Sequence, residues 1–126
     1  MAESRQALAR TLHAEAKALD LDVAEVLVEA TPPTLDGACL EVSTNTQQRI
    51  VTVAASEAHF QLPTEDQRVQ RLHELVHVLL SEIDTVLDRA LSRLAPDLRE
   101  VLSEDYVEAN ERVAYRLAPI LARALR

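Results

Sequence analysis

Residues 64–91 read TEDQRVQRLHELVHVLLSEIDTVLDRAL, and this stretch predicts the central helix of the fold. Its apolar residues recur at helical spacing in a stripe wide enough to predict a long, largely buried helix. Thr64, with Gln67 three residues later, forms a capping-box pattern that predicts where the helix begins. The stripe consists of Val69, Leu72, Val76, Leu79, Leu80, Ile83, Val86, Leu87 and Leu91.

The same stretch contains a His-Glu-x-x-His motif, His73-Glu74-Leu75-Val76-His77. A helix repeats every 3.6 residues, so His73 and His77 lie on one face, one turn apart. Two imidazoles in that arrangement can bind one Zn²⁺, and Glu74 can then act as general base towards a water molecule at the metal. The motif therefore predicts the active site of a zinc-dependent peptidase.

The N-terminal part of the chain predicts a helix followed by a strand. Residues 3–19 carry an apolar stripe at helical spacing. Residues 23–30 fit either a strand or a helix, but their β-branched content and the following Thr31-Pro32-Pro33 favour the strand. The stripe of the helix consists of Leu8, Ala9, Leu12, Ala16 and Leu19.

The next segment predicts an antiparallel hairpin. Residues 38–44 and 49–55 alternate apolar and polar side chains, and a short polar turn separates them. Asp36-Gly37 predicts a further turn before the first of these strands, and residues 56–63 predict a connecting loop.

The C-terminal part predicts a second long helix. Pro96 ends the motif helix and suits the first turn of the next one, which covers residues 98–125 with a kink or break at Pro119. The predicted fold class is α+β. It comprises an N-terminal helix, a small antiparallel sheet of two to three strands, and two long helices in a single domain of residues 1–126.

The last helix supplies candidates for a third metal ligand, because a catalytic zinc site generally takes three protein ligands. Glu111 lies at the edge of the apolar face of this helix, where an acid is costly unless it is paired or bound to metal. Glu108 points further towards solvent and is the second candidate. Asn110, at the centre of that face, is a candidate hydrogen-bonding partner for the metal site. The predicted apolar face comprises Val107, Ala114, Leu117, Leu121 and Leu125.

Composition and charge disfavour several classes of partner and indicate a cellular compartment. The 126 residues carry a formal charge of −8, which disfavours binding to nucleic acid and to anionic membranes. The chain has no apolar signal region and no run long enough for a membrane span. Cys39 is the only cysteine, so no internal disulfide can form and a reducing compartment, the cytoplasm, is expected.

The order of a helix, a small sheet, a motif helix and a glutamate-bearing helix resembles the compact gluzincin-type metallopeptidases. Among them it is most similar to the ImmA/IrrE family and related small phage or mobile-element proteins. The matching stretches are residues 49–53, 68–80 and 108–114. Val76 stands where that family usually has Gly, and the family's Glu-Ala-Asn motif would favour Glu108 as the ligand.

The resemblance implies a zinc metallopeptidase in which His73, His77 and Glu111, or Glu108 in place of Glu111, hold the zinc ion. Glu74 would take a proton from the attacking water and deliver it to the leaving amine. Candidates for stabilising the developing oxyanion are Tyr106, Tyr115 and His59.

The resemblance also implies a protein or peptide substrate, such as a regulatory protein of the repressor type. The predicted strand at residues 49–55 could pair with an extended substrate. The alternative is a zinc-binding phage or interaction protein that is catalytically silent. Retention of Glu74 weighs against that alternative, because a purely structural site needs no base.

Overall fold

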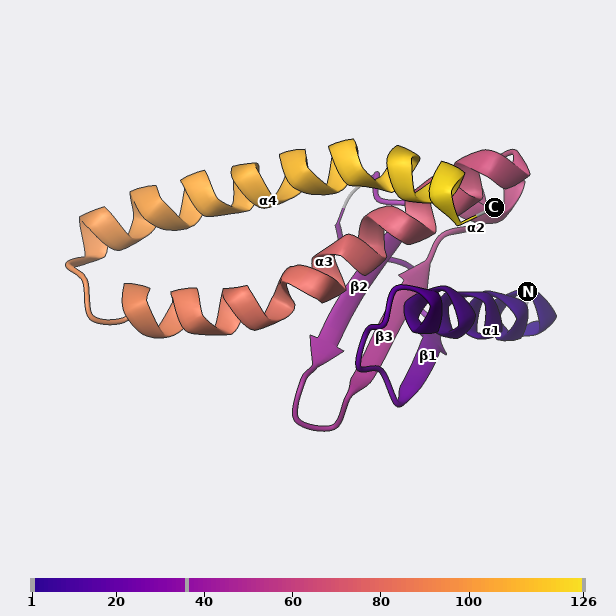
Figure 1. The fold of residues 1–126 in the computed structure, drawn as a ribbon, viewed down its shortest axis with the longest axis horizontal. Helices are drawn as coiled ribbons and strands as arrows, with labels where there is room; N and C mark the ends of the chain where they lie inside the picture. The colour runs from indigo at the N-terminus through magenta and orange to yellow at the C-terminus, as the bar shows by residue number, and fades with distance from the viewer. Residues whose placement is uncertain (1, 36, 126) are drawn as a thin grey trace.

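The computed structural model describes residues 2–35 and 37–125, and it confirms the predicted α+β architecture (Figure 1). The predicted turn at Asp36-Gly37 falls partly outside these residues, because Asp36 is not among them. In chain order the elements are α1 (Ala2–Ala18), β1 (Glu25–Glu29), β2 (Leu40–Asn45), β3 (Ile50–Ala55), α2 (Glu57–Gln61), α3 (Thr64–Leu91) and α4 (Pro96–Ala124).

The sheet contains three strands in the order β1-β3-β2. β2 and β3 form the predicted antiparallel hairpin, with Leu40 opposite Ala55. β1 instead pairs in parallel with β3, with Val26 opposite Val51, so the prediction of a purely antiparallel sheet is wrong for this strand. Alternating apolar residues report which face of a strand is buried and carry no information on strand order or direction.

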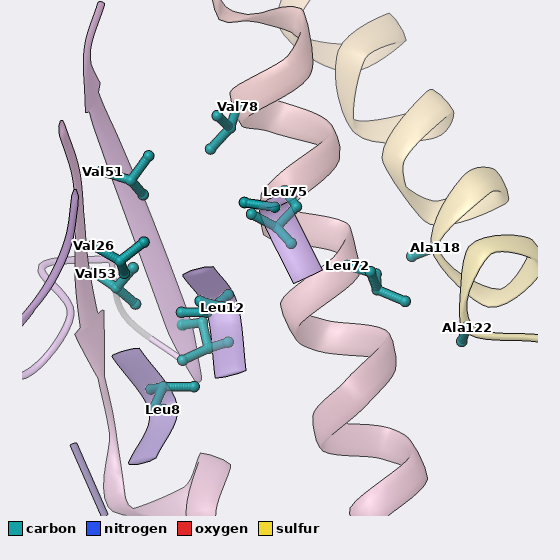
Figure 2. Packing of buried hydrophobic residues seen from close by; sticks show 12 residues of the cluster. Leu8, Leu12, Val26, Val51, Val53, Leu72, Leu75, Val78, Ala118 and Ala122 are labelled. Carbon is teal, nitrogen blue, oxygen red and sulfur yellow. The ribbon is translucent and has the colours of Figure 1, made fainter. Parts of the chain in front are cut away.

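One face of the sheet supplies part of the hydrophobic core. Val26, Val51 and Val53 point from this face towards α1 and α3 and are almost wholly buried. Figure 2 shows Leu8 and Leu12 of α1 between the strands and α3. The figure also shows Leu75 and Val78 of α3 on the side facing the strands, with Ala118 and Ala122 of α4 beside Leu72. The first half of α3 is therefore enclosed between the sheet and α4.

The second half of α3 extends beyond the sheet and packs beside α4 (Figure 1). Leu79, Ile83 and Val86 are 55%, 53% and 67% exposed, so the prediction of a largely buried stripe is wrong for this half. The cause is a mismatch in length. A helix of 28 residues is about 42 Å long. A strand of 6 residues is about 20 Å long, so the sheet covers only part of the helix.

The start of α3 lies at Thr64, as predicted, but the predicted capping box does not form. Pro63 occupies the N-cap position, and no side chain caps the helix. Gln67 instead donates from Nε2 to the carbonyl oxygens of Leu62 (2.8 Å) and Phe60 (3.3 Å). These bonds tie α3 to α2, a short helix within the segment predicted to be a loop.

α4 begins with Pro96 in its first turn, as predicted, and continues through Pro119 to Ala124 without a break. Its buried residues are Ala114, Ala118 and Ala122, spaced one turn apart. Val107 is 61% exposed, so the predicted buried face is wrong at this position. Leu117, also predicted to be buried, is exposed as well. Small side chains at the contact let two helices approach closely and leave larger apolar residues at its margins.

Within the described ranges, no helix has the length and apolar character that crossing a membrane requires.

Candidate metal centre

The structure brings together the side chains of His73 and His77 from α3 and Glu111 from α4. The two Nε2 atoms lie 3.2 Å apart. Glu111 places Oε1 at 2.7 Å from Nε2 of His77 and Oε2 at 3.4 Å from Nε2 of His73. All three side chains are partly buried, and one donor atom from each lies within 4.8 Å of the others. The cluster can therefore offer three ligands to one cation while staying open to solvent.

A chain of hydrogen bonds sets the orientation of His77. The Tyr106 hydroxyl donates to Asp84, and Asn110 Nδ2 lies 3.3 Å from the Tyr106 oxygen and 3.5 Å from Asp84 Oδ1. Because both of these neighbours accept a hydrogen bond from Nδ2, the amide of Asn110 must turn its Oδ1 towards His77. That oxygen lies 2.6 Å from His77 Nδ1, which therefore carries a hydrogen and donates it.

This tautomer leaves the cluster in need of a positive charge. A neutral His77 protonated at Nδ1 presents the lone pair of Nε2 to the carboxylate of Glu111, which is also an acceptor. Two acceptors at 2.7 Å repel unless a proton or a metal ion lies between them. In the metal-free protein a proton between the two atoms meets this need. A divalent cation meets it with both imidazoles neutral.

The donor set and two of its three separations fit zinc. Two imidazoles and one carboxylate form a ligand set that catalytic zinc sites use. Ligand atoms around a tetrahedral zinc lie about 3.3 Å apart, because the bonds to zinc are about 2.0–2.1 Å long. The separations of 3.2 Å between the imidazoles and 3.4 Å between Glu111 and His73 match this value. The 2.7 Å contact between Glu111 and His77 is the length of a hydrogen-bonded ion pair.

Glu108, the second candidate ligand, forms an ion pair with Arg112 at 3.3 Å, and both side chains are exposed. The geometry thus places Glu111 at the two imidazoles, whereas the resemblance to the Glu-Ala-Asn motif favoured Glu108. The role of Glu111 as a ligand stays a prediction.

Glu74 lines the same cavity as His73 and Glu111. Burial raises the pKa of its carboxyl group to about 8, and the negative charges of Glu111 and Glu41 add to the effect. Glu41 keeps its charge because the backbone N–H and hydroxyl of Thr34 both donate to it at 2.7 Å, which lowers its pKa. In the metal-free protein Glu74 therefore holds its proton at neutral pH. Burial also lowers the pKa of His73, which favours the neutral imidazole that a metal requires.

The three predicted oxyanion stabilisers occupy different surroundings. Tyr115 is 70% exposed and packs edge-on against His73, with ring centroids 4.6 Å apart, so its side chain borders the open site. Tyr106 donates its hydroxyl hydrogen to Asp84. His59 is fully buried, and its Nδ1 lies 2.7 Å from Gln70 Oε1. Tyr115 alone among the three borders the cavity that Glu74 lines.

Two residues that influence the site were not identified from the sequence. Asp84 follows His77 by seven residues, so helical geometry places both on one face of α3 and could have identified it. Glu41 affects Glu74 only because β2 packs beside α3, and no sequence signal linked the two.

Comparisons of the chain with known protein families, curated proteins and solved structures give no match. The resemblance to the ImmA/IrrE family therefore stays a prediction based on residue patterns, and the function has to be inferred from the geometry of the site.

The raised pKa of Glu74 predicts a pH-dependent loss of stability in metal-free protein. Between the unfolded-state value of 4.5 and the folded value of about 8, the folded protein holds a proton that the unfolded chain has released. Its free energy of unfolding therefore falls as pH rises through this window. Glu74→Gln removes the effect. We expect the free energy of unfolding of the variant, relative to that of the parent, to increase by about 2–4 kcal/mol as the pH rises from about 5 to about 9.

The measurement is urea unfolding in the presence of a chelator, with the exposed Glu82→Gln as the control. Parallel pH profiles for the parent and the Glu74→Gln variant would show that Glu74 is ionised in the folded protein.

Proposed function

We propose that this protein is a zinc-dependent peptidase of the cytoplasm that cleaves an extended segment of a protein or peptide. The observation that carries the proposal is the contact between His77 and Glu111. Asn110 holds His77 in the tautomer that directs the lone pair of Nε2 at this carboxylate and at His73. A divalent cation can bind Nε2 of both histidines and the carboxylate of Glu111 at the same time.

The cluster and its neighbours Glu74 and Tyr115 have separate roles in the proposed hydrolysis. A zinc ion held by His73, His77 and Glu111 would polarise the substrate carbonyl and acidify the attacking water. Glu74 takes the proton of that water and delivers it to the nitrogen of the leaving amine. The burial that raises the pKa of Glu74 also makes its carboxylate a stronger base. Tyr115, at the open edge of the site, is placed to donate its hydroxyl hydrogen to the developing oxyanion.

The strand that pairs with substrate is β2 rather than β3. The prediction for residues 49–55 is wrong, because β3 is the central strand and pairs with β1 and β2 on its two sides. β2 lies at the edge of the sheet and runs along the cluster. Leu40 lines a cavity with Glu74, while Val42 and Thr44 line another with His77. The free edge of β2 can therefore hold an extended chain by backbone hydrogen bonds. A regulatory protein of the repressor type stays the substrate that the family resemblance implies.

The assigned role of Glu74 predicts the effect of its removal. Zinc-loaded Glu74→Gln should cleave fluorescently labelled casein or a mixed peptide library at least about 100-fold more slowly than the parent, since general base catalysis contributes 10²–10⁴-fold. Its zinc content should be unchanged. Glu108→Gln is the matched control and should cleave normally. A parent that binds zinc and cleaves no peptide would favour the catalytically silent alternative.

The orienting role of Asn110 predicts weaker metal binding when its side chain is removed. Asn110→Ala should bind zinc about 10–100-fold less tightly, because partners of metal-bound histidines contribute affinity of that size. Competition with a fluorescent zinc chelator measures this, with the exposed Asn45→Ala as the control. Equal zinc affinity in the Asn110→Ala variant and the parent would contradict the orienting role.

A further inference from the structure

A cavity of about 460 Å³ opens beside the cluster, on the side of His73 and Glu74. We propose that this cavity receives an aliphatic side chain of the substrate, from the residue next to the bond that is cleaved. The inference rests on the proposed peptidase function and adds the class of residue that the site selects. The volume lies within the range of about 300–1,000 Å³ that is typical of small-molecule sites, so a leucine side chain fits readily.

The walls of the cavity away from the cluster are apolar and come from three separate parts of the chain. β2 contributes Leu40, the first turns of α3 contribute Val69, and α4 contributes Tyr115, Ala118 and Pro119. Leu40 and Ala118 both belong to the hydrophobic core, so the packing of the fold fixes their positions in these walls. A binding surface built on packed elements is already formed before the ligand arrives.

The described lining of the cavity contains no Lys or Arg side chain. His73 and Glu111 belong to the cluster and would hold the cation, and Glu74 would move the proton. Gln70 accepts a hydrogen bond from buried His59 at Oε1, and Cys39 and Tyr115 add a thiol and a hydroxyl to the lining. A charged substrate side chain would thus lose its hydration without gaining an ion-pair partner outside the proposed metal site, whereas an aliphatic one gains from burial.

The opposite side of the cluster has a different character, which gives the substrate one preferred placement. The cavity next to His77 is lined by Ser81, Asp84 and Asp88 from α3 and by Thr44 from β2. A chain that pairs with β2 therefore meets an apolar cavity on the Glu74 side and a polar one on the His77 side. The apolar cavity accepts an aliphatic side chain of that chain, and it thereby places the next peptide bond at the cluster.

Amino-acid hydroxamates test the inference, because the hydroxamate group chelates zinc and the side chain varies independently. Hydroxamates of glycine, leucine, aspartate and lysine are titrated into zinc-loaded protein by calorimetry. Leucine hydroxamate should bind at least about 10-fold more tightly than glycine hydroxamate, since each buried methylene contributes a factor of about 10 or more at such sites. Aspartate and lysine hydroxamates should bind no more tightly than glycine hydroxamate.

A variant that fills the cavity locates the effect. Ala38, just before β2, lines the cavity and is half-buried, so Ala38→Phe should reduce the affinity for leucine hydroxamate to that for glycine hydroxamate. Glycine hydroxamate should bind Ala38→Phe as it binds the parent. Ala58→Phe, on the exposed side of α2, is the matched control and should keep the preference for leucine.

The outcomes separate the two proposals. Zinc uptake with equal affinities for the four hydroxamates would overturn the cavity assignment and leave the metal site standing. A preference for the lysine compound would overturn it as well, in favour of recognition by the nearby carboxylates. Failure to take up zinc would overturn the proposed function and this inference together. If Ala38→Phe does not fold, the four hydroxamates on the unchanged protein decide alone.

Discussion

The close packing of α4 on α3 is the constraint on which the site depends. Ala114, Ala118 and Ala122 are buried one turn apart, and such small residues let the two helices approach until their side chains can meet. This approach places Glu111 within ion-pair distance of His73 and His77. The sheet packs against the other side of α3 through Leu75 and Val78, so the motif helix is held on both sides (Figure 2).

The electrostatics of the site follow from this packing. Partial burial favours the neutral form of His73 and raises the pKa of Glu74. The bond from Asn110 fixes the tautomer of His77. Each effect is unfavourable or neutral for an empty cluster and favourable for one that holds a cation, because the metal needs neutral imidazoles and its charge stabilises nearby carboxylates. This arrangement supports the proposal that the cluster binds a metal ion.

Sequence reasoning predicted the parts of the structure that depend on local pattern. The motif helix, the hairpin and the start of α4 at Pro96 all followed from spacing and turn residues. Helical phase also ranked Glu111 above Glu108, and the geometry places it at the imidazoles. The parallel pairing of β1 and the exposure of Ile83 depend on which elements meet in space, and local pattern does not report that. The same holds for Glu41, which reaches Glu74 only through tertiary packing.

The most direct test is the zinc content of the purified, untagged protein beside that of Glu111→Ala and Glu108→Ala. A metal centre formed by His73, His77 and Glu111 predicts about one zinc ion per chain in the parent and in Glu108→Ala, and a marked loss in Glu111→Ala. Each substitution removes one glutamate carboxylate from α4, at positions three residues apart. A difference in zinc content between the two variants therefore identifies which carboxylate is the ligand. A parent protein that takes up no zinc even when zinc is supplied would contradict the metal centre and the peptidase function built on it.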